Sequence, residues 1–144
     1  MNRYRELRSK QQETFNHLPI GWAFGQKQFD EMMRNWGLDP ENDTDKIYHI
    51  GSGGYVMRKD ADLLHETVDD LNAELQAAIA ADETGEGFIY EMFLEELENH
   101  EYGYTRDITD TLDALGYTID DIRANDRLIK GLAMAMALIE DSGS

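Results

Sequence analysis

Apolar residues recur every three to four positions along most of the chain, which is the spacing of amphipathic helices. This spacing and the residues that flank each stretch predict helices over residues 2–17, 27–36, 60–81, 86–99, 108–115 and 126–140. Asp60 and Thr84 are placed as N-caps of the third and fourth helices, and Gly116 as the C-cap of the fifth. A further short helix is expected after Thr118, because Thr118 and Asp121 have the spacing of a capping box.

The pattern changes between residues 46 and 58. Two short runs rich in β-branched and aromatic residues, 46–50 and 55–58, flank the glycine-rich sequence 51–54, which predicts a β-hairpin. Upstream, we expect a turn at Gly21 and then an apolar plug formed by residues 22–24. The predicted fold class is α+β and predominantly α-helical, with about six or seven helices and one short β-hairpin in a single domain, 1–144.

Two stretches of the second half interrupt the simple pattern. Residues 102–104 (YGY) predict a break between helices. The last helix is apolar on nearly all sides over residues 132–139, so it is either central to the core or a contact between copies of the chain.

Charge is divided unevenly along this sequence. Residues 1–60 contain nine acidic and nine basic side chains and are neutral, whereas residues 61–144 contain 21 acidic and four basic ones. The second part therefore carries the whole formal charge of −17. Residues 61–105 hold 13 carboxylates and no lysine or arginine. A field concentrated in this way selects basic partners and accelerates their encounter.

Many of these carboxylates repeat at helical spacing, so they form rows. Seven pairs of like charge stand three or four residues apart and together cost about 1.5–3.5 kcal/mol before screening by salt. One interpretation is a solvated face that serves solubility. The other is a row that imitates nucleic-acid phosphates and binds a basic protein, through side chains on the two central helices: Glu66, Asp69, Asp70, Glu74, Glu91, Glu95 and Glu98.

One carboxylate departs from the polar face of its helix. The helical wheel places Glu96 inside the apolar arc of residues 86–99, where an unpaired charge is costly. We expect an ion pair with an arginine or a hydrogen bond from a tyrosine. The basic residues near the N-terminus, Arg3, Arg5, Arg8 and Lys10, could contact RNA, but intramolecular or head-to-tail pairing with the acidic face is the simpler account.

The sequence offers no convincing cofactor or metal site. The loop 51–54 lacks the Gly-Lys-Ser/Thr ending of a phosphate-binding loop, and the four histidines do not have a metal-ligand spacing. The absence of cysteine fits a reducing cytoplasm. No apolar run is long enough to span a bilayer, and the negative charge disfavours direct binding to nucleic acid or to anionic membranes.

Five blocks of the chain carry a resemblance. They are residues 44–48 (TDKIY), 51–55 (GSGGY), 84–89 (TGEGFI), 96–102 (ELENHEY) and 107–116 (DITDTLDALG). As a set, they are similar to a family of short acidic proteins of unassigned function from phages and mobile elements of Firmicutes. The resemblance implies no catalytic residues. By analogy, it implies an anti-defence role of the anti-CRISPR or anti-restriction kind.

Three hypotheses follow from the sequence. The first is a non-enzymatic inhibitor that places its acidic rows in the DNA- or RNA-binding groove of a bacterial defence nuclease, in the host cytoplasm. The second is an interaction or regulatory module that binds a protein, or a second copy of itself, through residues 132–139 and the region 22–24. The third is a small hydrolase that uses Glu96.

Overall fold

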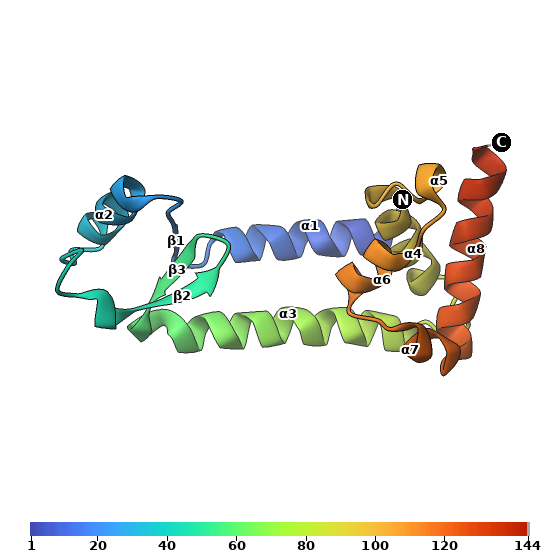
Figure 1. The fold of residues 1–144 in the computed structure, drawn as a ribbon. Coiled ribbons are helices and arrows are strands. Elements are labelled where there is room, and N and C mark those ends of the chain that lie inside the picture. Colours follow the sequence, from blue (N-terminus) through green and yellow to red (C-terminus); the bar gives the residue numbers. More distant parts are fainter. Residues whose placement is uncertain (144) are drawn as a thin grey trace. The chain divides into compact units, whose positions relative to one another are not determined.

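The computed structural model describes residues 1–143, and Figure 1 shows the order of the elements. The α-helices are α1 (Arg3–Asn16), α2 (Gln26–Asn35), α3 (Ala61–Ala81), α4 (Phe88–Asn99), α5 (Tyr102–Thr105), α6 (Thr109–Leu115), α7 (Ile119–Arg123) and α8 (Asp126–Ser142). The strands are β1 (Ile20–Trp22), β2 (Ile47–Gly51) and β3 (Gly54–Met57), and the hairpin of β2 and β3 lies between two 3-10 turns, η1 (Thr44–Lys46) and η2 (Arg58–Asp60). The predicted α+β class, with helices in the majority, is confirmed.

The chain forms two compact units. Unit 1 contains Met1–Gln12 and Ala73–Ser144, and unit 2 contains Glu13–Asn72. Each unit has an apolar core of its own. The boundaries between the units lie within α1 and within α3. They do not coincide with residue 60, where the charge balance of the sequence changes.

The core of unit 1 is built around α4 and α8, which pack closely against each other. Ile89, Met92, Phe93 and Leu97 of α4 are fully buried, as the apolar arc of this helix predicts. The two helices approach closely where α8 carries Gly131. A Cβ atom added there would lie 2.6 Å from the Cγ2 atom of Ile89, so a larger residue would separate the helices.

Unit 2 combines α2 with a three-stranded antiparallel sheet in the order β1-β3-β2. The predicted hairpin is confirmed, with Ile47 opposite Met57 in the register. Its turn requires the glycine-rich sequence, because Gly51, Ser52 and Gly53 all have positive φ angles. Met33 of α2 is fully buried in the core of this unit.

The region around Gly21 differs from the prediction. Residues Ile20–Trp22 form a third strand that pairs with β3, with Gly21 opposite Tyr55. The expected apolar plug is also wrong for two of its three residues, since only Ala23 is buried while Trp22 is 50% and Phe24 74% exposed. A run of three residues after a proline is too short to show the two-residue alternation that identifies a strand. Only the pairing with β3 makes these residues a strand.

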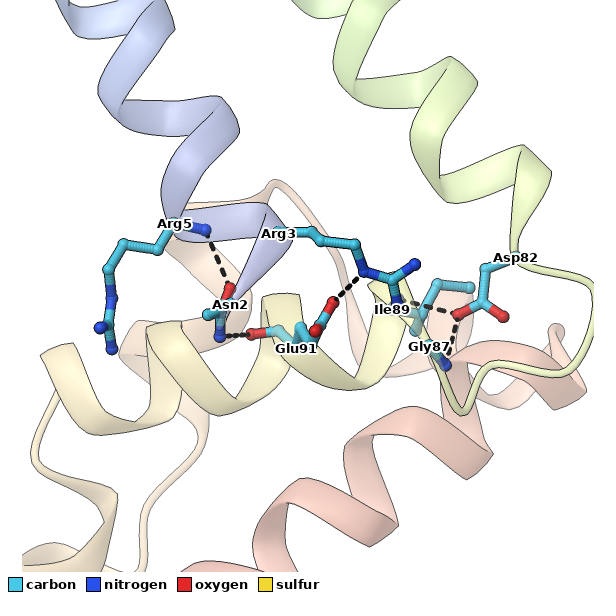
Figure 2. Close-up of polar contacts among 7 residues, drawn as sticks. All are labelled: Asn2, Arg3, Arg5, Asp82, Gly87, Ile89 and Glu91. Atoms are coloured by element: carbon cyan, nitrogen blue, oxygen red, sulfur yellow. Dashed lines mark hydrogen bonds and ion pairs between the residues drawn. The ribbon is translucent and has the colours of Figure 1, made fainter.

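The start of α4 is held by a different residue from the one predicted. Thr84 does not cap this helix, since the N-cap position is Gly87. Instead, the carboxylate of Asp82 accepts hydrogen bonds from the backbone N–H groups of Gly87 and Ile89, at 3.0 and 2.9 Å (Figure 2). Burial alone raises the pKa of Asp82, but the N–H donors outweigh it and hold the pKa below its ordinary value.

The later helices agree with their local sequence patterns except at one place. The capping box of Thr118 and Asp121 is present at the start of α7. The predicted break at residues 102–104 is instead the short helix α5, which lies between two non-glycine residues of positive φ, Glu101 and Arg106. In α8, Leu132 and Ala135 are buried in the core while Met134 and Leu138 on the other side are exposed.

Candidate protein-binding surface

The first part of α3 carries a row of exposed carboxylates. Asp62, Glu66, Asp69 and Asp70 belong to unit 2, and all four side chains are exposed. Within residues 1–143, no ion pair or side-chain hydrogen bond involves any of them. Since successive turns of a helix are about 5.4 Å apart, the row presents several negative charges at short, regular intervals. Such a surface is suited to a basic protein partner.

The like-charge pairs on α3 have a cost that a single substitution measures. Glu66 stands three or four residues from Asp62, Asp69 and Asp70, so Glu66→Lys replaces three repulsions with attractions. We expect the variant to raise the free energy of unfolding by about 1 kcal/mol at low salt, and by less at high salt. Urea denaturation at two salt concentrations measures this. An unchanged or lower stability would show that the carboxylates do not repel each other appreciably.

The carboxylates of α4 have a different environment. The helical wheel places Glu91 and Glu95 toward solvent, but their side chains are only 17% and 14% exposed. Arg3 of α1 binds Glu91 at 2.7 Å, and Arg5 binds Glu95 at 2.6 Å. Figure 2 shows Arg3 reaching across to Glu91, and the side-chain amide of Asn2 donating to the backbone carbonyl of Glu91 at 2.8 Å. The expected pairing of the N-terminal arginines with acidic residues is confirmed for these two.

This pairing changes the estimate of electrostatic repulsion. On α4 the negative charges of Glu91 and Glu95 are offset by arginines, and Glu101 lies beyond the end of that helix. Of the seven pairs counted from the sequence, those without such an offset are therefore the four on α3, which together cost about 0.8–2 kcal/mol.

Two of the sequence-selected carboxylates lie elsewhere in unit 1. Glu74 is exposed and accepts a hydrogen bond from the side-chain amide of Gln11 at 3.2 Å. Glu98 is exposed on α4 and lines a shallow depression with Tyr104 and Ile139. Of the seven residues selected from the sequence, Glu66, Asp69 and Asp70 thus lie together in unit 2, and the other four belong to unit 1.

Glu96 has the kind of partner that its place on the wheel requires. Its carboxylate accepts a hydrogen bond from the phenol of Tyr4, and the side-chain amide of Asn99 donates to it at 3.1 Å. Arg8 is close enough to Tyr4 to influence its titration. The tyrosine partner expected from the sequence is confirmed, and these contacts explain Glu96 as a structural residue that fastens α1 to α4.

The Tyr4 phenol should lose its proton at a higher pH than an ordinary tyrosine. Burial, with a contribution from the negative charge of Glu96, raises its pKa to about 12. Burial also raises the pKa of Tyr102 and of Tyr117. Because an unfolded tyrosine loses its proton near pH 10, Tyr4 contributes stability that is complete below about pH 10 and is lost as the pH rises through about 12.

We therefore expect the free energy of unfolding to fall between about pH 9 and pH 11, and to fall less in Tyr4→Phe. Denaturation at both pH values measures the change, and absorbance near 295 nm follows the phenolates directly. An identical pH dependence in wild type and Tyr4→Phe would contradict the assignment.

Exposed apolar side chains form the other feature of interest for protein binding. In unit 2 they include Trp22, Tyr48 and Ile50 of the sheet, and a Cβ atom added to Gly54 would lie within 3.1 Å of both Trp22 and Ile50. In unit 1, α8 exposes Ile129, Met134 and Leu138. Large apolar residues that are exposed close together, as Trp22 and Ile50 are, are typical of contact surfaces.

Two kinds of site are not found in the part of the chain that the structure describes. No group of three or more His, Asp or Glu side chains there could hold a metal ion. None of the helices in residues 1–143 is long and apolar enough to cross a membrane.

Comparison with known protein families identifies a family for this chain. The model of a family described as "Family of unknown function (DUF7659)" matches residues 3–137. Neither the comparison with curated proteins nor the comparison with solved structures finds a match.

Proposed function

The chain belongs to this family of unknown function, DUF7659, and we propose that it is a non-enzymatic inhibitor of a bacterial defence nuclease. In this proposal the exposed carboxylates of α3 occupy a groove lined with lysine and arginine that otherwise binds DNA or RNA. The target is a nuclease of the CRISPR or restriction type, and the inhibitor acts in the cytoplasm of the host. The resemblance to proteins of phages and mobile elements supports this context by analogy.

The observation that carries the proposal is the exposure of the acidic row on α3 and its lack of basic partners among the described residues. Asp62, Glu66, Asp69 and Asp70 are exposed, closely spaced and, among the described residues, without a basic partner. Their mutual repulsion lowers stability, and a lysine at one position would relieve it. The chain balances Glu91 and Glu95 with arginines, so the first part of α3 differs from α4 in leaving its negative charges without a basic partner among the described residues.

Capture from a host lysate tests the proposal. Immobilised protein should retain a nuclease at about 50 mM salt and release it at about 500 mM, because the Debye length shortens about threefold. The captured nuclease, once purified, should then lose its binding to DNA or RNA when the acidic protein is added to it. Retention that does not depend on salt, or a nuclease that still binds its nucleic acid fully, would contradict mimicry.

A second candidate function rests on the exposed apolar side chains. Here the protein is a regulatory module that binds a partner, or a second copy of itself, through α8 or through the region of Trp22 and Phe24. A test substitution on α8 must avoid side chains that pack against the core of unit 1, such as Met136. Met134→Glu on the exposed side of α8 should abolish binding through α8, whereas lysines in the α3 row should leave it intact.

A further inference from the structure

Unit 2 contains a hollow of about 420 Å³ with an apolar floor and a cationic rim. The partly buried side chains of Trp36, Leu38 and Met57 line it. Lys46, Arg58, Lys59 and Asp45, all exposed, line the same hollow. Sites for small molecules typically have volumes of about 300–1,000 Å³, mostly apolar walls and a few polar groups that fix orientation. The hollow has these properties.

The register of the hairpin explains why these side chains meet. Ile47 at the start of β2 is opposite Met57 at the end of β3. Lys46 directly precedes that pair in η1, and Arg58 directly follows it in η2. The two cations are therefore brought to the same end of the hairpin, although like charges repel each other.

This gathering of positive charge is unusual for the chain that contains it. The protein has 13 lysines and arginines against 30 acidic residues, and unit 2 has only five of the 13. Three of those five line this one hollow. With Asp45 included, the charged residues that line the hollow have a formal net charge of +2, whereas the acidic row on α3 is entirely negative.

The three cationic side chains differ in their contacts with other residues. Lys46 binds Asp43 at 3.0 Å. The guanidinium of Arg58 lies 4.5 Å from the ring centre of Tyr48, an interaction that leaves its N–H groups able to donate. Lys59 has no ion pair or hydrogen bond with any described residue. Lys59 and Arg58 are therefore the side chains best placed to receive an anion.

We propose that this hollow binds a small aromatic molecule that carries one anionic group. The aromatic part lies on Trp36, Leu38 and Met57, and the carboxylate, sulfonate or phosphate pairs with Arg58 and Lys59. Asp45 at the rim disfavours ligands with several negative charges. The site is independent of the α3 row and of the proposed function, since its residues lie between positions 36 and 59.

Two dyes that differ mainly in charge test the proposal. The probes are 8-anilinonaphthalene-1-sulfonate, which is an aryl anion, and N-phenyl-1-naphthylamine, which lacks the sulfonate. In Trp22→Phe, which leaves Trp36 as the only indole, binding of the sulfonate should quench tryptophan fluorescence and saturate. The double variant Arg58→Gln/Lys59→Gln should weaken sulfonate binding by at least about fivefold and leave the neutral dye unaffected.

The matched control removes the other two cations of unit 2. Lys27→Gln/Arg34→Gln changes the net charge equally, lies outside the hollow and should bind both dyes as the wild type does. Asp45→Asn should strengthen binding of the sulfonate. Lys59→Gln alone should give a smaller loss of sulfonate binding than the double variant. Because it leaves Arg58 and its contact with Tyr48 in place, this single variant controls for an effect of the double variant on folding. The proposal is overturned if the wild type does not bind the sulfonate, or if the two double variants bind it equally.

Discussion

The triple variant Glu66→Lys/Asp69→Lys/Asp70→Lys is expected to lose the proposed inhibition of a nuclease completely. The three carboxylates are exposed and unpaired within the described residues, so their reversal should repel a basic groove without removing a contact that holds unit 2 together. Close charge pairs at protein interfaces have coupling energies of about 1.5–7 kcal/mol, so three reversals exceed the loss that most complexes tolerate. Inhibition of cleavage, titrated against the purified target, measures the effect.

A matched control uses three exposed carboxylates of unit 1. Glu83→Lys/Asp110→Lys/Asp113→Lys changes the net charge by the same amount, from α6 and the turn before α4. This variant should retain inhibition if the position of the charge matters and lose it if only the total charge does. Reversal of Glu91 and Glu95 is a poor test, because it would also break their pairs with Arg3 and Arg5. Full inhibition by the α3 variant would leave the apolar surfaces as the remaining basis for binding.

Replacement of Gly85 by alanine is expected to destabilise unit 1 more than any other glycine-to-alanine change outside close helix contacts. Gly85 is buried in the turn before α4 with a φ angle of 88°, and a Cβ atom there would overlap the backbone carbonyl of Arg127. The carbonyl belongs to α8 and cannot move without that helix. Strain at positive φ and overpacking together should cost about 3–5 kcal/mol.

Gly116 provides the control for this prediction. It also has a positive φ angle, of 76°, but no atom lies within 4 Å of the place where its Cβ would be. Gly116→Ala should therefore cost only about 1–2 kcal/mol, the price of the left-handed backbone. Urea denaturation of the two variants separates the contribution of the contact with Arg127 from that of the backbone. Equal losses would show that α8 adjusts to the added atom.

Local sequence predicted much of the fold because its causes are local. The capping box at Thr118 is complete within four residues, and the hairpin turn depends on the glycines at positions 51 and 53. The apolar arc of α4 identified the buried residues of that helix, since a period of 3.6 places them on one side. It also identified Glu96 as a residue that needed a partner.

The predictions that failed involve partners distant along the chain or several competing local ones. The strand β1 exists because it pairs with β3, more than 30 positions later, and not because of its own sequence pattern. Asp82 and Thr84 are both good caps, and only the path of the turn decides that Asp82 reaches Gly87 and Ile89. The four-residue helix α5 lies between Glu101 and Arg106, which both have positive φ angles. A Tyr-Gly-Tyr sequence does not indicate such a helix.

The sequence by itself determined where most of the helices lie and how much negative charge the second part of the chain carries, because periodicity, caps and ionisable groups are properties of the residues themselves. Only the tertiary structure decided which carboxylates remain available to a partner. Arg3 and Arg5 are 88 and 90 residues from Glu91 and Glu95, so no local pattern shows that folding pairs them. The first part of α3 has no such arginine among the described residues, and its carboxylates stay exposed.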